Sequence, residues 1–435
     1  MYGLIITFIL ILLLIIEKIL IKNWINPAYI MIAYWSIFIV SAIIAFGTDF
    51  NWNYLGLIWI IFAIIIFLFG QIIGSSFAKN KILYKASAVE TNKILSNASS
   101  QFIFICIIIG LLKVLIEVVA NGFSVHMFFH INSLINMNTY MAQQRYYGGI
   151  SYSIIMQIML IFVYAAPLCG GYSFVYAEKK SSRLLSFATF IPIIGELLLT
   201  NGKAGMIGSA FLWFSGYFVA YVEKYKKSPR ICMKILVKVV VVIVFLFSLL
   251  YFSMLLRIGN FSIQTRDLVT KKFLVYALGS IPAFDEWFSN YFYNYNPSYS
   301  LGTYTFIGLF NLLGISLRKQ GVFSDIVVIL NGYTNVFTAF RGIILDYGMI
   351  GGLIFVMLFG IIAGYSFRII LKRSRSTVIH RVLLSSIYFF IMQSVLGSAW
   401  AYLSYILAFF VFSIYLWLAD REFELSFKLG RRKMY

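Results

Sequence analysis

The sequence contains few charged residues and very few acidic ones. Only 11% of its 435 residues are charged, whereas an ordinary soluble domain has about 25%. Hydrophobic residues make up 61%, and the mean hydropathy is +0.90. This composition excludes a soluble globular enzyme and a disordered chain. It predicts a single membrane domain over residues 1–435, although the length alone would allow about three soluble domains.

Cysteines and familiar catalytic motifs are also scarce. The three cysteines are Cys106 and Cys169, inside apolar stretches, and Cys232 in a basic loop; they suggest neither a disulfide framework nor a metal cluster. The sequence has no GxxxxGK[ST], HExxH, CxxC or GxSxG pattern, which disfavours soluble-type ATPases, zinc proteases and hydrolases. His126 and His130 have the spacing of metal ligands on one helical face. No carboxylate or third histidine follows nearby, so no metal site is predicted.

Apolar stretches long enough to cross a hydrocarbon core of about 30 Å recur along the chain. Backbone groups in lipid must be satisfied within a helix or a closed barrel, and continuous apolar runs favour helices over alternating barrel strands. The expected fold is therefore an all-α polytopic membrane protein with about 11 transmembrane helices and one large outer loop. The predicted spans are 3–22, 26–46, 53–74, 101–120, 151–175, 184–200, 205–222, 235–256, 344–367, 381–396 and 399–419.

The basic residues predict how these spans are oriented. The chain has 35 Lys and Arg against 15 Asp and Glu, and 25 of the 35 lie on one side if the even-numbered spans run outward. The positive-inside rule then places the N-terminus outside and residues 420–435 in the cytoplasm as a basic tail. Since the charges form short runs between apolar spans, the lipid bilayer is the expected partner and nucleic acid is not.

Two segments predicted to lie outside are long, at residues 121–149 and 257–343. The second connects spans eight and nine, and a connection of that length is usually functional or disordered. It is rich in aromatic and aliphatic residues, as in FDEWFSNYFYNYNPSYSLGTYTF at 284–306. We therefore expect it to fold and to lie against the membrane surface. Its aromatic residues suit either an interfacial belt or a platform for sugar rings.

Ionisable residues inside apolar spans are costly and often functional. Lys113 and Glu117 are four residues apart, which predicts a self-neutralising pair facing the other helices. Glu196, Thr200 and Lys203 share one helical face if the helix continues. The Asn-Gly turn signal at 201–202 favours the alternative, in which the helix stops and Lys203 begins the next span at the outer surface.

The large outer loop supplies cations and one adjacent acidic pair. A guanidinium binds phosphate in a bidentate fork, so Arg257, Arg266 and Arg341 are candidates for an anionic ligand. Attraction to lipid headgroups is the alternative, and it is favoured for Arg318 and Lys319. Asp285 and Glu286 form the acidic pair, which suits either a general base for a hydroxyl group or a solvated surface.

The stretch NGYTNVFTAFRGIILDYGMIGGLIF at 331–355 resembles a segment of the oligosaccharide repeat-unit polymerases, the Wzy-type O-antigen and capsule polymerases. TNGKAGM at 200–206 resembles a Thr-Gly-x-Arg turn of that family, with Lys203 in the usual arginine position. Lysine keeps the positive charge there but lacks the bidentate fork. The matching positions in the first stretch are Asn335, Thr338, Phe340, Arg341, Asp346, Tyr347, Gly348 and Gly351.

The resemblance implies an integral-membrane glycosyltransferase that needs no cofactor, nucleotide sugar or metal. Such an enzyme transfers a growing glycan from undecaprenyl diphosphate to the distal sugar of an incoming lipid-linked repeat unit, at the outer face of the bacterial cytoplasmic membrane. A chain-length regulator and a flippase are the implied protein partners. A polysaccharide ligase and a repeat-unit flippase remain alternatives. The long outer loop and the lack of an internal repeat disfavour the flippase.

This chemistry assigns roles to the candidate residues. The departing diphosphate requires cations, and the acceptor hydroxyl requires a base. Asp346 has the alternative role of capping span nine, favoured by the helix dipole. The predicted catalytic residues are Arg341, Arg257, Arg266, Glu196 and Asp346, and the predicted substrate-binding residues are Lys203, Asn335, Thr338, Tyr347, Asp285 and Glu286.

The predicted orientation is tested by labelling single cysteines in a background without the three natural ones. Ser324→Cys should react with a membrane-impermeant maleimide on intact cells, because residue 324 lies in the outer loop. Ser374→Cys should react only after permeabilisation, because residue 374 lies in a basic inner loop. The reverse result would contradict the assignment.

Overall fold

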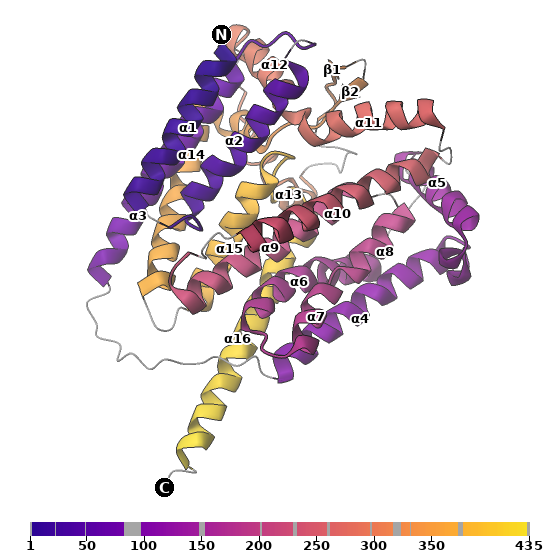
Figure 1. Ribbon diagram of the computed structural model, residues 1–435, viewed down its shortest axis with the longest axis vertical. Coiled ribbons are helices and arrows are strands. Elements are labelled where there is room, and N and C mark those ends of the chain that lie inside the picture. The colour runs from indigo at the N-terminus through magenta and orange to yellow at the C-terminus, as the bar shows by residue number, and fades with distance from the viewer. Residues whose placement is uncertain are drawn as a thin grey trace. The chain divides into compact units, whose positions relative to one another are not determined.

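The computed structural model describes residues 2–21, 23–47, 49–81, 97–147, 153–200, 202–228, 233–258, 262–295, 298–315, 323–330, 332–372 and 377–432. The prediction of an all-α polytopic membrane protein is confirmed, because helices make up nearly all of the regular structure (Figure 1). Within the described residues, nine helical segments are long and apolar enough to cross a membrane. The two remaining predicted spans correspond to shorter apolar segments, Val244–Leu255 and Val378–Gln393.

The contacts within the chain group its residues into two compact units. Unit 1 comprises Met1–Glu90, Tyr225–Ser228 and Lys271–Leu403, and unit 2 comprises Thr91–Lys224, Pro229–Thr270 and Ser404–Tyr435. Helix α11 (Ile263–Leu278) contributes residues to both. The other elements of unit 1 are α1 (Tyr2–Ile21), α2 (Pro27–Phe46), α3 (Leu55–Lys81), α12 (Ser280–Tyr293), α13 (Ile307–Leu312), β1 (Val327–Ile329), β2 (Gly332–Thr334), α14 (Ala339–Lys372) and α15 (Val378–Gln393).

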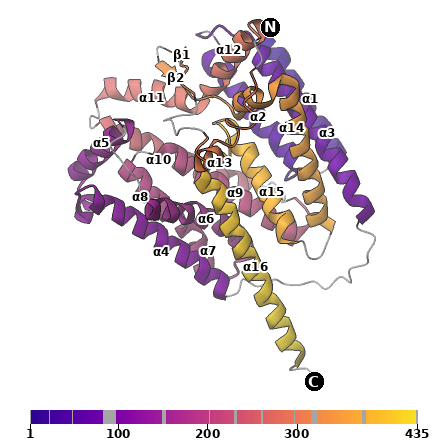
Figure 2. The ribbon, with the colours of Figure 1, turned by 180° about the vertical axis from the view of Figure 1, so that it is seen from behind.

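Helices α3 and α14 of unit 1 pack backbone against backbone (Figures 1 and 2). A Cβ atom at Gly74 would overlap the carbonyl of Ile361, and one at Gly364 would overlap the carbonyl of Gln71. Small residues four apart allow this close approach between membrane helices. The contacts advance in the same direction along both helices, which are therefore parallel. The glycines at the contact are Gly70, Gly74, Gly360 and Gly364.

Helix α14 is broken at Gly348, where the backbone adopts φ 78° and ψ 174°. Only glycine adopts this conformation readily, and a Cβ atom there would lie 2.8 Å from the ring of Tyr299. The break separates a first segment, which begins at Ala339, from the longer second segment. The helix thus begins five residues before the predicted start of span nine. Phe340 explains the earlier start, because its ring packs against Trp35 and Trp59 at centroid distances of 5.0 and 5.3 Å.

Residues 257–343 were predicted to form a large outer loop, and their described part contains helices α11, α12 and α13 and a small hairpin. The hairpin pairs β1 with β2 in antiparallel register, with Val327 opposite Thr334 and Ile329 opposite Gly332. The sequence analysis predicted no strands. Two strands of three residues are too short to produce a clear alternation of apolar and polar side chains.

Unit 2 is entirely helical within its described residues. Its helices α6 and α9 run antiparallel and pack closely through glycines. A Cβ atom at Gly171 would overlap the carbonyl of Trp213, and a Cβ atom at Gly216 would overlap the carbonyl of Leu168. The predicted span 184–200 consists of two helices, α7 and α8. Besides part of α11, the elements are α4 (Asn97–Ala120), η1 (Val125–Phe129), α5 (Ile131–Tyr147), α6 (Ile154–Tyr176), α7 (Lys180–Ala188), α8 (Ile191–Thr200), α9 (Lys203–Tyr225), α10 (Met233–Ile258) and α16 (Leu403–Arg432).

A buried cluster brings the C-terminal ends of α4 and α8 together. Val118 from α4 and Leu199 from α8 pack with Leu134, Met137 and Met141 from α5. Helix α5 lies within the predicted first outer loop, 121–149, so the described part of that loop is mostly helical. This packing also holds Glu117, one residue before Val118, near Glu196, three residues before Leu199.

Substitution of the contact glycines tests the packing of α3 on α14. Gly74→Ala and Gly364→Ala should each lower the free energy of unfolding by about 1–3 kcal/mol, because the added methyl group meets backbone that cannot move aside. The control is Gly351→Ala in the same helix, where the new Cβ would meet only the Cβ of Tyr347, at 3.1 Å. Thermal unfolding in detergent measures the difference. Equal stability of all three variants would contradict the close contact.

Candidate functional site

Arg341 lies in the first turn of α14 and is almost fully buried, with 5% of its surface exposed. Its backbone N–H donates to the carbonyl of Thr338, and the ring of the preceding Phe340 is fixed among the aromatic residues of α2 and α3. The position of this arginine is therefore determined by the core of unit 1 and does not depend on a loose loop.

Three aromatic rings surround the guanidinium group of Arg341. Its central carbon lies 4.0 Å from the ring centroid of Phe323, 4.1 Å from that of Phe337 and 5.0 Å from that of Trp287. Phe323 precedes β1, Phe337 follows β2, and Trp287 belongs to α12. The faces of aromatic rings attract cations within about 6 Å. The hairpin and α12 thus build a largely dry enclosure, which we call the aromatic cage.

One nitrogen of the caged guanidinium pairs with a carboxylate, and the others do not. Nη2 donates to Oδ2 of Asp325, whose side chain is 59% exposed. Nε and Nη1 are buried and have no hydrogen-bond partner among the described residues. Buried donors without partners are rare in folded proteins and call for an explanation. An oxyanion that reached Arg341 would find two nitrogens available and a third whose partner is accessible to solvent.

Aromatic residues continue from the cage toward the surface. Trp287 stacks on Tyr291 at 5.1 Å between ring centroids, and Tyr291 meets Tyr295 edge to face at 5.7 Å. The hydroxyl groups of Tyr295 and Tyr299 are 2.9 Å apart, and both residues are exposed. This hydrogen bond raises the pKa of Tyr295 to about 12. The rings form a surface of the kind on which sugars stack.

The carboxylate of Asp285 holds the start of α3. It accepts hydrogen bonds from the backbone N–H groups of Asn53, Tyr54 and Gly56, each at 2.9 Å. Burial raises the pKa of this carboxyl, and the same backbone donors lower it in part. Both oxygens are occupied, so the predicted role of Asp285 in substrate binding is not supported by its contacts. It acts instead as an N-cap supplied from a distant part of the chain.

Asp346 has a similar structural role. Its Oδ1 accepts from the hydroxyl of Ser300 at 2.7 Å and from the N–H of Tyr304 at 3.1 Å, and its Oδ2 accepts from the N–H of Thr305 at 2.6 Å. The carboxylate therefore fixes the turns before α13. Neither the predicted catalytic role nor the cap of span nine describes these contacts.

Among the three acidic site residues predicted in unit 1, Glu286 is the one whose carboxylate makes no structural hydrogen bond in the described part of the chain. It is half-buried on α12, and no hydrogen bond or ion pair involves it within the described residues. Partial burial, with the neighbouring charge of Asp285, raises the pKa of its carboxyl.

The other predicted residues of unit 1 differ in exposure. Asn335 is exposed in the segment between β2 and α14, and Thr338 is buried, with a hydroxyl that has no partner among the described residues. Tyr347 is half-buried and stacks on Phe355 at 5.0 Å. The carbonyl of Thr338 accepts a hydrogen bond from the backbone N–H of Arg341, at 3.2 Å.

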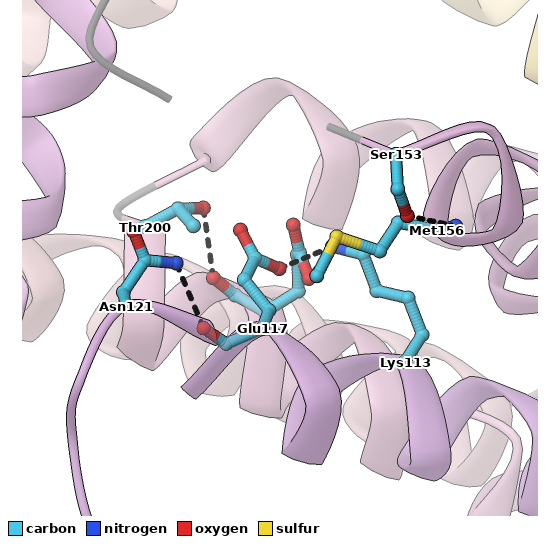
Figure 3. A network of polar contacts seen from close by, with 7 residues as sticks. Lys113, Glu117, Asn121, Ser153, Met156 and Thr200 are labelled. Atoms are coloured by element: carbon cyan, nitrogen blue, oxygen red, sulfur yellow. Dashed lines mark hydrogen bonds and ion pairs between the residues drawn. The ribbon is translucent and has the colours of Figure 1, made fainter. Parts of the chain in front are cut away.

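The predicted residues of unit 2 form a separate group. The amino group of Lys113 donates to Glu117 on the same helix (Figure 3). It also donates to Glu196 on α8. Helix α8 ends at Thr200, and α9 begins at Lys203, which is half-buried. The continuous face from Glu196 to Lys203 is therefore interrupted, as the Asn-Gly alternative predicted.

Among the remaining predicted cations, only Arg266 has a described side chain, which is exposed on α11. Arg257 falls in the last turn of α10, and its side chain lies outside the described residues. Arg318 and Lys319 also lie outside them.

Metal binding finds no support in the described part of the chain. No group of three or more His, Cys, Asp or Glu residues is arranged there to hold an ion. His126 and His130 do meet, with their Nε2 atoms 3.3 Å apart, and both are exposed.

Sequence reasoning missed Phe323, Asp325 and Phe337, which complete the surroundings of Arg341. They lie 18, 16 and 4 residues before it, in segments without a helical period. Comparisons with protein-family models, curated proteins and solved structures found no match. The interpretation of the site accordingly depends on its geometry and on the chemistry of its residues.

Substitution of the acidic pair on α12 tests the structural role of Asp285. Asp285→Ala should lower the free energy of unfolding by about 2–3 kcal/mol, because it leaves buried N–H groups of the α3 start without an acceptor. Glu286→Ala, one residue away, should change it by less than about 0.5 kcal/mol, because no described contact is lost. Thermal unfolding in detergent gives both values. Similar losses in the two variants would contradict the capping role.

Proposed function

We propose that the protein polymerises undecaprenyl diphosphate-linked oligosaccharide repeat units into a surface polysaccharide. In this reaction the bond between the anomeric carbon of the growing glycan and its diphosphate oxygen breaks. A new bond forms from that carbon to a hydroxyl of the incoming unit, the hydroxyl proton passes to a base, and the lipid diphosphate leaves. The observation that carries the proposal is the caged guanidinium of Arg341, with two buried nitrogens that have no partner among the described residues.

A departing diphosphate gains negative charge as its bond to the sugar breaks. A cation held in dry surroundings stabilises this charge far better than one in water, and it needs no rearrangement at the moment of reaction. Arg341 has these properties, because aromatic rings replace water around it and the core of unit 1 fixes its position. Asp325 keeps the cation paired while no substrate is bound, and its exposure allows a phosphate to take its place.

Two further features support the same substrate class. The aromatic run from Trp287 to Tyr295 offers faces for sugar rings beside the cage. The polytopic membrane fold suits a substrate whose lipid chain remains in the bilayer. Glu286 is the base we propose, because its carboxylate has no described partner and its raised pKa favours proton uptake.

The positive-inside distribution and the resemblance of residues 331–355 to repeat-unit polymerases support the setting of the reaction. In this proposal the enzyme lies in the bacterial cytoplasmic membrane with its N-terminus outside and its C-terminus in the cytoplasm. Arg341, at the start of α14, then faces the outer surface, where lipid-linked repeat units are joined.

Deletion of the gene and complementation with variants test the proposal. The deletion strain should accumulate lipid diphosphate carrying a single repeat unit, exposed to reagents outside the cell. Arg341→Ala should lower the rate of chain growth by about 10²–10³, because one electrostatic donor is lost. Arg341→Lys should restore it only in part, because a point charge cannot hold two oxygens in a fork. Glycan length on gels, at matched protein level, is the measurement.

Lys271→Ala is the matched control, since Lys271 is an exposed cation on α11 of the same outer segment; it should leave chain length unchanged. Repeat units that accumulate only on the inner side would indicate a flippase. Long lipid-linked chains that are never attached to their acceptor would indicate a ligase. Wild-type chain length in Arg341→Ala would reject the proposed role of the cage.

A further inference from the structure

A second buried charged cluster, in unit 2, has no part in the proposed reaction. Lys113 of α4 donates to Oε2 of Glu117 on the same helix and to Oε2 of Glu196 on α8. Lys113 and Glu117 have at most 1% of their side-chain surface exposed, and Glu196 has 11%. Figure 3 shows Lys113 and Glu117 turned toward each other between the helices. We refer to these three residues as the triad.

The charges of the triad do not balance when all three groups are ionised. One ammonium then faces two carboxylates, which leaves one net negative charge in apolar packing. The C-terminal ends of α4 and α8 meet here as well, and the negative ends of their dipoles oppose a further anion. A buried net charge is costly, and such groups usually become neutral instead.

The contacts indicate how the imbalance is removed. Glu117 and Glu196 accept from the same ammonium nitrogen of Lys113, so their carboxyl groups lie close together. Two carboxylates so placed repel each other, since both are acceptors, whereas a carboxylic acid can donate to a carboxylate. Oε1 of Glu117 is buried and has no partner among the described residues when all groups are ionised. We propose that the triad is a binding site for one exchangeable proton, shared by Glu117 and Glu196 and held beside the ammonium of Lys113.

The neighbouring elements bring no other acid to the triad in the described part of unit 2. Helix α6 carries no charged residue, and Lys180 and Arg183 of α7 and His126 of η1 are exposed. A metal ion is disfavoured as the ligand, because the ammonium already occupies the space between the carboxylates. The proton reaches the site through Glu196, which is the one member with an exposed fraction above 1%. The remaining titratable groups on α4 to α8 are Cys106, Tyr140, Tyr164, Cys169, Tyr172, Tyr176, Arg145, Tyr146 and Tyr147, of which the last three have no described side chain. Lys203, which begins α9 after the end of α8, is a half-buried cation.

The experiment uses dicyclohexylcarbodiimide, an apolar reagent that adds to protonated carboxyl groups in apolar surroundings. Peptide mass spectrometry of the full-length protein should find about one adduct per molecule, on Glu117 or Glu196, at pH values where an exposed glutamate, with a pKa of about 4.3, is ionised. The adduct should decrease as the pH rises, because deprotonation of the shared site removes the reactive form.

Reciprocal variants identify a shared proton. In Glu117→Gln, Glu196 and Lys113 form a neutral pair, so the adduct on Glu196 should fall at least about tenfold, the effect of a one-unit shift in proton affinity. Glu196→Gln should have the same effect on Glu117. In Lys113→Gln the ammonium is lost, both carboxyls become neutral, and adducts should appear on both.

Glu17 of α1 provides the internal control. It is a buried carboxyl in unit 1 whose oxygens have no partner among the described residues, so its adduct should persist in every folded variant. Glu17→Gln should remove that adduct and leave the triad unchanged. An adduct on Glu196 that is unchanged in Glu117→Gln would overturn the shared proton. The shared proton would also be overturned if the wild type gave no adduct on either Glu117 or Glu196, while Glu17 reacted and the Lys113→Gln variant gave adducts on both.

Discussion

The close contact between α3 and α14 determines where the other parts of unit 1 lie. Glycines bring the two backbones together, so neither helix can rotate or slide without a clash. The start of α3 is fixed to α12 by the carboxylate of Asp285, and α12 carries Trp287. At the other side, Phe340 of α14 packs against Trp59 of α3. This pair of helices therefore positions both Arg341 and the Trp287 ring of the aromatic cage.

The sequence predicts the membrane spans well because each span carries its own signal, a continuous apolar run of sufficient length. Arg341 was a candidate from sequence, because it lies in the stretch that resembles repeat-unit polymerases and because a guanidinium suits an anionic ligand. The residues that surround it were not predicted. Phe323 and Asp325 approach it through an irregular segment and a short hairpin, for which neither hydropathy nor periodicity gives a signal.

Contacts across long sequence separations explain the other differences. The carboxylate of Asp285 binds backbone N–H groups about 230 residues earlier in the chain. An N-cap normally comes from the residue next to the helix, so an isolated Asp-Glu pair gives no indication of this role. Lys113 and Glu117 were predicted to pair from their spacing, and they do. The third member, Glu196, is 83 residues from Lys113 and was assigned to the face of a neighbouring helix instead.

The two buried cations are stabilised in different ways. Lys113 contacts two carboxylates, those of Glu117 and Glu196, so the negative charge around it exceeds its own positive charge when all three groups are ionised. Arg341 has one carboxylate and is otherwise surrounded by π-electron faces, which attract a cation without forming hydrogen bonds with it. Carboxylates would use up the nitrogens of a guanidinium, whereas aromatic rings leave them free to bind a ligand. In our proposals, the first arrangement holds an exchangeable proton and the second binds an oxyanion.

The aromatic cage also changes how the arginine responds to ionic strength. Mobile ions screen exposed charges over about 8 Å at physiological salt, but they act much less on a charge from which water is excluded. The exposed Lys271 and Lys272 of α11 attract anions weakly once salt is present. Arg341, enclosed by Phe323, Phe337 and Trp287, retains its attraction. Residues 257–343 thus combine exposed cations, whose long-range attraction salt suppresses, with one enclosed cation, whose short-range attraction is screened much less.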